Sequence, residues 1–348
     1  MSKRILLTVF TAVITSFFAF SQHQEHAEAQ KATGHENHES EEKFDISGMI
    51  MHHISDEHGW EFAHGLKLPL PVILYTHDSG LEIFSSRRLD HGQVYNGWKN
   101  EHEHIVKVNA DGTVNEAIHP WDFSITKNVA SLFLSAVLLI LIFTAVKKGY
   151  DKNKGKAPSG IQSFLEPVIL YMRDDVVKPA IGKNYEKYFP YLLTLFFFIL
   201  INNLLGLLPG GANLTGNIAI TMTMAVITFL IVNLNGNKYY WKHVFMPDTP
   251  KLMWIILIPV EIVGVFMKPL SLMIRLFANI TAGHIIMLSL FGLIFIFQNW
   301  AVSPVVAGFA LFMNLIELLV AFLQALIFTL LTSMYIGSAI EDHSHDHH

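Results

Sequence analysis

Arg275 is the residue of this sequence that most clearly needs a charge-related role, because it lies within the apolar run PLSLMIRLFANITAGHII. A guanidinium group stays charged in proteins, and holding one at the centre of a bilayer costs about 2.5–3.5 kcal/mol on insertion scales. The charge is therefore expected to face protein or water and to act on other charges. Glu317 raises the same question, since apolar residues of the next long run lie on both sides of it.

Other polar residues fall on the same side of the helix expected around Arg275. At 100° per residue, four side chains lie within about 40° of Arg275 around the helix axis. These four are Glu261, Lys268, Ser271 and Asn279. On the next run Glu317 and Gln324 are nearly eclipsed, and Asn314 lies about 60° from Glu317. Polar stripes on two otherwise apolar helices indicate a hydrated path or an interface that bears charge.

Most of these residues also have a plainer interpretation. Hydrogen bonds between helices would account for Ser271, Asn279, Asn314 and Gln324. Lys268 could extend to the membrane surface, and Glu261 could lie at a solvated helix end. His284 falls about 180° from Arg275, so it could be a core histidine, and it joins a path past Arg275 only if the helix kinks or the path wraps around it.

The composition is typical of a polytopic helical membrane protein. The 348 residues are 51% hydrophobic and only 15% charged, with a mean hydropathy of +0.38, which is too apolar for a soluble globule. The net charge of −5 gives no sign of a nucleic-acid partner. The sequence has no cysteine, which excludes disulfides and thiolate metal sites, and no GxxxxGK[ST] loop for a nucleotide.

The elements that must position the polar residues follow from the apolar runs. Five runs are long enough to cross a bilayer: 129–146, 188–208, 214–234, 252–297 and 301–340. The last two far exceed the roughly 20 residues that a crossing needs, so long, tilted or kinked helices are expected. Residues 160–187 suit an amphipathic helix on the cytoplasmic surface. Lysines follow the first run at 147–156, which places that end, and after five crossings the C-terminus, in the cytoplasm. The predicted fold is an all-α polytopic membrane protein.

The residues before the first run are expected to be exported. Residues 1–21 have the basic start and apolar centre of a signal peptide, with an uncleaved anchor helix as the alternative. Residues 22–48 are polar and rich in histidine, and are expected to be disordered. Residues 49–125 predict a small β-rich periplasmic extension, with strands in LPLPVILY and LEIFSS and a turn at Asp111-Gly112. The remaining segments are a membrane domain at 126–340 and a histidine-rich cytoplasmic tail at 341–348.

The runs KPLSLMIRLFANITAGHIIM and FMNLIELLVAFLQALIFTLL resemble the two signature helices of the subunit a family of F-type ATP synthases. LFFFILINNLLGLLPG resembles the third helix of that family. The resemblance covers about residues 125–340; the exported segment looks like an extension carried by some Gram-negative lineages. It implies a proton-translocating stator subunit in the inner membrane of a Gram-negative bacterium. The implied partners are protons, lipid, a ring of c subunits, b-type stalk subunits and the rest of the synthase, without cofactor or metal.

The resemblance also implies roles for single residues of the membrane domain. Arg275 matches the stator arginine that faces the carboxylate of each passing c subunit, and Asn279 and Gln324 match polar neighbours of that contact. Glu261 matches an acid of the cytoplasmic half-channel, and Ser271 is expected to add polar lining. A permanent cation suits the place of Arg275, because a guanidinium does not release a proton and so cannot relay one.

The periplasmic half-channel of the family commonly has an acid on the first signature helix and a histidine on the second. Here His284 lies on the first and Glu317 on the second, an exchange that favours an interacting pair. Gly206 stands where some members carry an acid, and it is given no role. In the implied cycle a proton enters by the pair, neutralises a c-subunit carboxylate and leaves near Glu261 after almost a full rotation.

Two other functions fit part of the sequence. An ion-coupled secondary transporter would need a substrate cavity with broken helices and usually has inverted repeats, and no repeat is evident. A metal-handling membrane protein would use the histidines between residues 23 and 58 and those of the tail. A solvated segment with incidental metal affinity explains those histidines better, since the sequence has no cysteine and the histidines have no fixed spacing.

Overall fold

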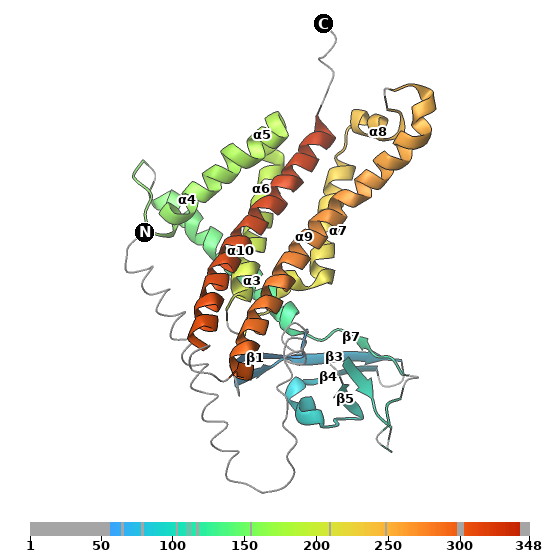
Figure 1. Cartoon of the computed structure of the whole chain (residues 1–348), viewed down its shortest axis with the longest axis vertical. Helices are drawn as coiled ribbons and strands as arrows, with labels where there is room; N and C mark the ends of the chain where they lie inside the picture. The colour runs from blue at the N-terminus through green and yellow to red at the C-terminus, as the bar shows by residue number, and fades with distance from the viewer. Residues whose placement is uncertain are drawn as a thin grey trace. The chain divides into compact units, whose positions relative to one another are not determined.

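The computed structural model describes residues 56–341, apart from 64–65, 78–79, 102–103, 110, 112, 116–117, 154, 209, 248 and 298–302. The signal peptide expected at 1–21, the segment at 22–48 and the tail beyond Glu341 lie outside the described residues. The described chain begins with a β-rich segment and continues as long helices (Figure 1).

Short antiparallel strands build the β-rich segment. Strand β3 (Pro71–Thr76) lies between β4 (Gly80–Ser85) and β7 (Trp121–Asp122). Two pairs complete it: β1 (Gly59–Ala63) with β2 (Leu66–Pro69), and β5 (Trp98–Glu101) with β6 (His104–Lys107); the 3-10 helix η1 (Ser86–Gly92) follows β4. Alternate residues of β3 and β4 face one small core, formed by Val72, Leu74, Phe84, Leu89, Trp98 and Ile105. The expected strands are confirmed. Of the turn expected at Asp111-Gly112, Gly112 lies outside the described residues; the flanking Asn109 N–H donates to Thr113 O.

The helical part contains four helices that are long and apolar enough to cross a membrane. A fifth results if α7 and α8, bent by 102° against each other, count as one span; this total refers to the described residues. The helices are α3 (Lys127–Lys152), α4 (Ile161–Tyr171), α5 (Lys178–Ile181), α6 (Tyr185–Gly206), α7 (Ile218–Leu234), α8 (Lys238–Phe245), α9 (Trp254–Phe297) and α10 (Ser303–Ile340). Short turns lie between them: the π-helix η2 (Met172–Val177) and the 3-10 helices η3 (Gly182–Asn184), η4 (Leu214–Gly216) and η5 (Lys251–Met253). The protein is thus a mostly helical membrane protein with a small β-rich N-terminal segment.

The lengths of the last two helices explain the unusually long apolar runs. With 44 and 38 residues, α9 and α10 are about 66 and 57 Å long, roughly twice the 30 Å hydrocarbon core of a bilayer. The segment expected at 160–187 is helical as well. Gly182 interrupts it just before α6, because its φ of 73° lies in the left-handed region that glycine tolerates.

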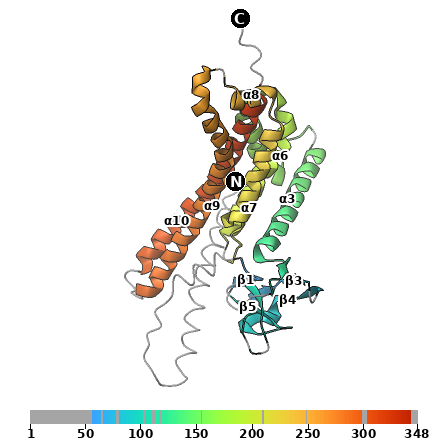
Figure 2. The ribbon, with the colours of Figure 1, turned by 90° about the vertical axis from the view of Figure 1, so that its right-hand side faces the viewer.

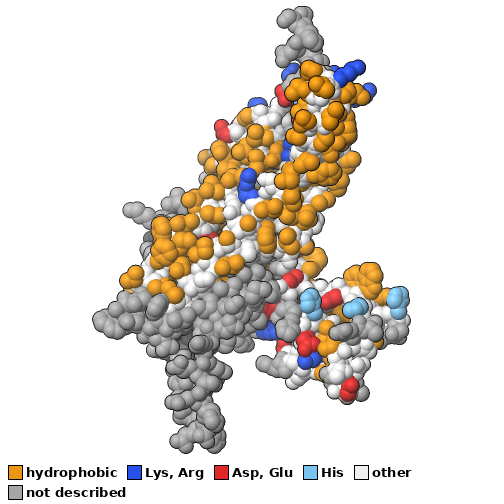
Figure 3. Space-filling model, turned by 45° about the vertical axis from the view of Figure 1, so that its right-hand side comes forward, with side chains coloured by type: hydrophobic (Ala, Val, Ile, Leu, Met, Phe, Trp, Pro, Cys, Tyr) orange, Lys and Arg blue, Asp and Glu red, His pale blue; other side chains and the backbone are white. Residues whose placement is uncertain are grey.

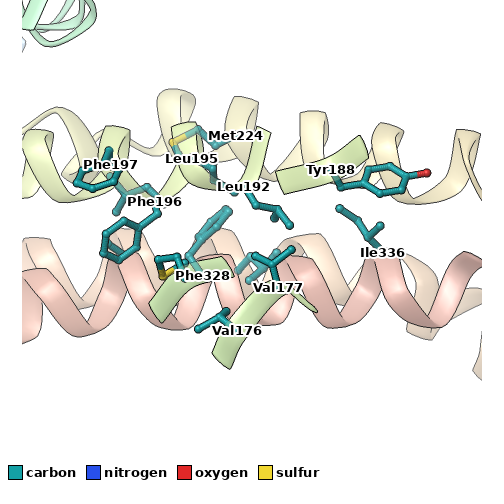
Figure 4. Close-up of a cluster of buried hydrophobic side chains, with 14 of the residues drawn as sticks. Val176, Val177, Tyr188, Leu192, Leu195, Phe196, Phe197, Met224, Phe328 and Ile336 are labelled. Carbon is teal, nitrogen blue, oxygen red and sulfur yellow. The ribbon is translucent and has the colours of Figure 1, made fainter. Parts of the chain in front are cut away.

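The hydrophobic core of the bundle lies where α6 packs against α10. Figure 2 shows the course of the two helices, and Figure 4 shows buried side chains of this core, among them Leu192, Phe196 and Phe328. Phe196 contacts Phe197 and Phe322 edge to face, with ring centroids 5.1 and 5.9 Å apart. Since lipid tails are as apolar as these side chains, close packing is the main force that associates such helices.

Gly337 on α10 is one place where this packing tolerates no side chain. A Cβ atom there would clash with the backbone carbonyl oxygen of Ala180 on α5. We expect Gly337→Ala to destabilise the folded protein by about 1–3 kcal/mol, as overpacked sites do. A thermal melt of the purified protein measures the effect. Gly308→Ala on the same helix is the control, because its Cβ would meet nothing within 4 Å; equal melting temperatures of the two variants would refute the prediction.

The β-rich segment is fixed to the helices by buried polar contacts. The indole N–H of Trp60 donates to Gly210 O, between α6 and η4, at 2.8 Å. The Asp56 carboxylate accepts from the Thr126 hydroxyl at 2.9 Å and from the Asn128 backbone N–H at 3.1 Å. Thr126 is also the N-cap of α3. The segment is therefore attached at the start of α3 and at the loop between α6 and α7.

Candidate functional site

Helix α9 carries polar residues on two opposite faces. Arg275 and Asn279 are exposed on one face, whereas His284 on the other is only 8% exposed. The half-turn separation expected from the sequence for Arg275 and His284 is therefore present in the structure. Any path that involves both groups must pass around α9.

Arg275 lies on an apolar and uncovered surface. Only 6% of the most apolar stretch of α9 is buried within the chain, against 44% for the segment that contains α6. The neighbouring Ile274 is 49% exposed, and Leu319 on α10 is 58% exposed. Figure 3 shows the hydrophobic side chains over the helices, interrupted by a few cationic groups. Within the described part of the chain, Arg275 has no hydrogen-bond or ion-pair partner. The guanidinium of Arg275 is thus exposed beside apolar side chains.

Glu317 and His284 are buried between helices: Glu317 of α10 lies against α9, and His284 of α9 lies against α6. Glu317, 8% exposed on α10, lies against Gly283 so closely that a Cβ there would be 2.9 Å from Glu317 Oε1. His284 lies against Gly206 of α6, where a Cβ would be 3.7 Å from its Nε2. The two glycines make room for the two titratable side chains. Glu317 of α10 thus lies against α9 at Gly283, the residue before His284, and both titratable groups are buried.

The interior beside these groups is polar. Asn203 donates from its amide to Ala321 O at 3.0 Å and accepts from the Thr215 hydroxyl at 2.7 Å, which joins α6, α10 and η4. The turn η4 packs against α3, α6, α7 and α9. Several buried side-chain atoms of this region have no partner within the described residues: Asn128 Oδ1, Ser131 Oγ, Asn202 Oδ1, Asn213 Nδ2 and Glu317 Oε1. Buried polar groups in such a state are ordinarily satisfied by internal water.

A third set of polar residues lies around Lys268, nearer the N-terminal end of α9. The ammonium of Lys268 lies over the rings of Tyr335 and Tyr240, 5.5 and 5.9 Å from their centroids. A pocket between α7, α8, α9 and α10 includes these three residues and Asn233, which accepts from the Tyr240 hydroxyl at 3.2 Å. Glu261, half-buried two turns earlier on α9, acts electrostatically on both Tyr240 and Lys268.

The residues predicted from the sequence therefore fall into three places. Glu317 and His284 are both buried, against Gly283 and Gly206 respectively. Arg275 and Asn279 are exposed, and Glu261 lies towards the Lys268 pocket. Gln324 is buried on α10 at 7% exposure, and Ser271 is half-buried on α9. In the described part of the chain, no group of three or more His, Asp or Glu side chains could hold a metal ion.

Sequence reasoning missed the polar lining around η4. Its members on α6 are Asn202 and Asn203, which are 1% and 3% exposed. The signal was present, since two adjacent asparagines interrupt the apolar run LFFFILINNLLGLL. Their partners on η4 and α10 depend on how the helices pack, which spacing alone does not reveal.

Two family models match the chain in successive parts. The model described as ATP synthase A chain matches residues 129–337. A domain of unknown function, DUF8433, matches residues 49–123. The first match covers the helices that carry the polar groups, and the second covers the β-rich segment.

Curated relatives share the sequence over most of its length. An ATP synthase subunit a of Chloroherpeton thalassium is 44% identical over 252 residues, which are 70% of this chain and 73% of the relative. An ATP synthase subunit a 2 of Chlorobaculum tepidum is 48% identical over 236 residues, 66% of this chain and 67% of the relative. An ATP synthase subunit a of an Anaeromyxobacter species is 34% identical over 334 residues, 92% and 76% of the two chains.

Proposed function

The chain belongs to the ATP synthase A chain family, and from this premise we propose how its polar residues divide the transport of protons. It is subunit a of the ATP synthase, the proton-translocating stator subunit of the Fo sector, and a multi-pass membrane protein of a bacterial synthase. It works with the rest of that complex and has no nucleotide-binding role. Because the chain belongs to this family, the alternatives of a secondary transporter and of a metal-handling protein are rejected.

We propose that Glu317 and His284 form the exported half-channel. The observation that carries this assignment is the position of Glu317, a buried carboxyl group whose Oε1 has no partner among the described residues and which lies beside a polar interior. Water that reaches such a carboxyl group can give it a proton and take one away. The loop that carries η4 supports the exported side, because it has no basic residue and binds Trp60 of the segment before α3.

Arg275 is the barrier charge of this proposal. The uncovered apolar face of α9 and α10 suits a ring of c subunits, which would bring a carboxylate to the cation. An ionised carboxylate is attracted to Arg275, while a neutral one can turn away into lipid at a lower cost. The same charge repels a proton that would pass directly between the half-channels. Each proton that crosses the membrane at 100 mV releases about 2.3 kcal/mol. Several protons per turn of the c ring can therefore drive the formation of ATP elsewhere in the complex.

The cytoplasmic half-channel is assigned to Glu261, with the pocket of Lys268, Tyr240 and Asn233 beside it. Lysines at 238, 242 and 251 flank this end of the helices, which supports a cytoplasmic location. Ser271 lines the route between the pocket and Arg275, and Asn279 and Gln324 hold polar contacts near the c ring. The assignment places the C-terminus in the cytoplasm and the β-rich segment in the periplasm of a Gram-negative bacterium. The b-type stalk subunits are proposed as further partners that hold this stator.

Gly283→Ala tests the exported half-channel without removing a titratable group. The new Cβ would lie 2.9 Å from Glu317 Oε1 and 3.2 Å from its Cδ, so the flexible carboxyl group has to move. We expect a several-fold fall in ATP-driven proton pumping by inverted vesicles at an unchanged amount of assembled complex. Gly264→Ala on the same helix is the matched control, since its Cβ would meet nothing within 4 Å. Unchanged pumping in both variants would contradict the assignment of Glu317.

A further inference from the structure

The sheet of β3, β4 and β7 has an apolar face that points away from the core. Tyr75 pairs with Leu81 of β4 and with Trp121 of β7. Ile73 pairs with Ile83, and its carbonyl oxygen accepts from the N–H of Phe123. Directly paired residues share a face, and so do alternate residues of one strand. The outer face therefore includes six large apolar side chains, beside Pro71 and Ser85 at its edge: Ile73, Tyr75, Leu81, Ile83, Trp121 and Phe123.

This outer face is unusual for a sheet in water. Five of its six side chains are between 41% and 64% exposed, namely Tyr75, Leu81, Ile83, Trp121 and Phe123. An antiparallel sheet with one solvated face normally has polar residues there. None of the six is charged. A contiguous apolar surface with these properties marks an interaction site.

The chain itself places this face next to the bilayer. Phe123 lies three residues before Thr126, the N-cap of α3, and three residues span at most about 11 Å. Helix α3 continues with lipid-type exposed side chains such as Phe133 and Ile140, which are 58% and 67% exposed. Three of the six residues of the outer face are aromatic, including Trp121 and Tyr75. Tryptophan and tyrosine are enriched where a membrane meets water.

The core of the segment lies on the opposite side of the sheet. Val72, Leu74 and Phe84 pack there with residues of η1, β5 and β6. In Figures 1 and 2 β5 lies farther from the helices than β3 does. The outer face is thus turned to the side on which α3 enters the membrane. Figure 3 shows hydrophobic side chains gathered on this part of the β-rich segment, with histidines beside them.

We propose that the outer face of the β3–β4–β7 sheet rests on the lipid surface at the exported side of the membrane, with its aromatic side chains at the level of the headgroups. The β-rich segment then has two attachments, to the helices through Trp60 and Asp56 and to the bilayer through this face. The two attachments together hold the β-rich segment on the membrane surface beside the α6–α7 loop.

Spin labelling of the whole complex tests this contact. The chain has no cysteine, so Leu81→Cys in an otherwise cysteine-free synthase carries one nitroxide on the outer face. The complex is reconstituted into vesicles of phosphatidylethanolamine and phosphatidylglycerol. Power saturation then compares collisions with oxygen, which dissolves in lipid, and with a nickel chelate, which stays in water. Val94→Cys is the control, because Val94 is 54% exposed and lies outside this face.

A label at Leu81 is expected to show a several-fold higher ratio of oxygen to nickel collisions than a label at Val94, and Ile83→Cys should repeat the result. ATP-driven pumping should be unchanged in all three variants, which confirms that the complex is assembled. A label that meets nickel as often as the one at Val94 would overturn the proposal. Protection from both reagents would overturn it as well, because it would mean that a protein covers the face: residues 1–55, another subunit or a second copy.

Discussion

Arg275→Ala is expected to abolish ATP-driven proton pumping, with a loss of two orders of magnitude or more. The physical reason is the absence of any other cation on the surface of α9 near the level of Arg275 in the described chain. Without it, a c-subunit carboxylate has no charge to attract it, and protons meet no electrostatic barrier between the half-channels. Fluorescence quenching of an acridine dye in inverted vesicles measures pumping, and the collapse of an imposed gradient measures the leak that is expected beside it.

Two neighbouring variants make this result specific. Ile274→Ala removes an exposed side chain, 49% accessible, from the adjacent position, and it should pump at close to the original rate. Arg275→Lys keeps a positive charge but replaces a permanent, planar cation by an amine that can lose its proton. It should restore only a small part of the activity. Coupled pumping by Arg275→Ala at the original rate would contradict the assignment of Arg275 as the barrier charge between the half-channels.

Glu317→Gln is the second change with a large expected effect. Glutamine has nearly the same shape, so the packing against Gly283 should survive, but the side chain can no longer exchange a proton with water. We expect proton conduction through the membrane sector to fall at least tenfold. Conduction is measured in vesicles from which the catalytic sector has been removed, after a potassium diffusion potential is applied.

Asn314→Ala provides the comparison for Glu317→Gln. Asn314 lies on the same helix, three residues earlier, and is half-buried. Loss of an interhelical hydrogen bond typically costs about 0.6 kcal/mol in membrane bundles, so this variant should keep most of its conduction. Equal losses in the two variants would argue that Glu317 has a packing role and no role in proton transfer.

The sequence was sufficient for the long helices and for the residues on their faces. Periodicity placed Arg275 and Asn279 on one side of α9 and His284 on the other, because the geometry of a helix is fixed by its backbone. An apolar run of more than forty residues predicted α9, and the short runs LPLPVILY and LEIFSS predicted β3 and β4. Pro259 and Pro269 both lie within α9, so neither proline ends the helix.

Contacts between helices were beyond what the sequence could predict. That Glu317 lies against Gly283 and His284 against Gly206 depends on which helices pack together and at what height. The position of the Lys268 ammonium over the rings of Tyr240 and Tyr335 is another contact that the sequence did not predict. These contacts arise from tertiary packing, and neither period nor composition encodes them directly.

The central claim is that two polar regions of this subunit open to opposite sides of the membrane and do not meet. Asn202 of the inner polar region and Asn233 of the Lys268 pocket can each be replaced by cysteine in a chain that has none. Sealed vesicles of both orientations are then treated with a membrane-impermeant silver or thiol reagent, and the loss of proton conduction is recorded. We predict that Asn202→Cys reacts only from the exported side and Asn233→Cys only from the cytoplasmic side. Reaction of either cysteine from both sides would contradict the account.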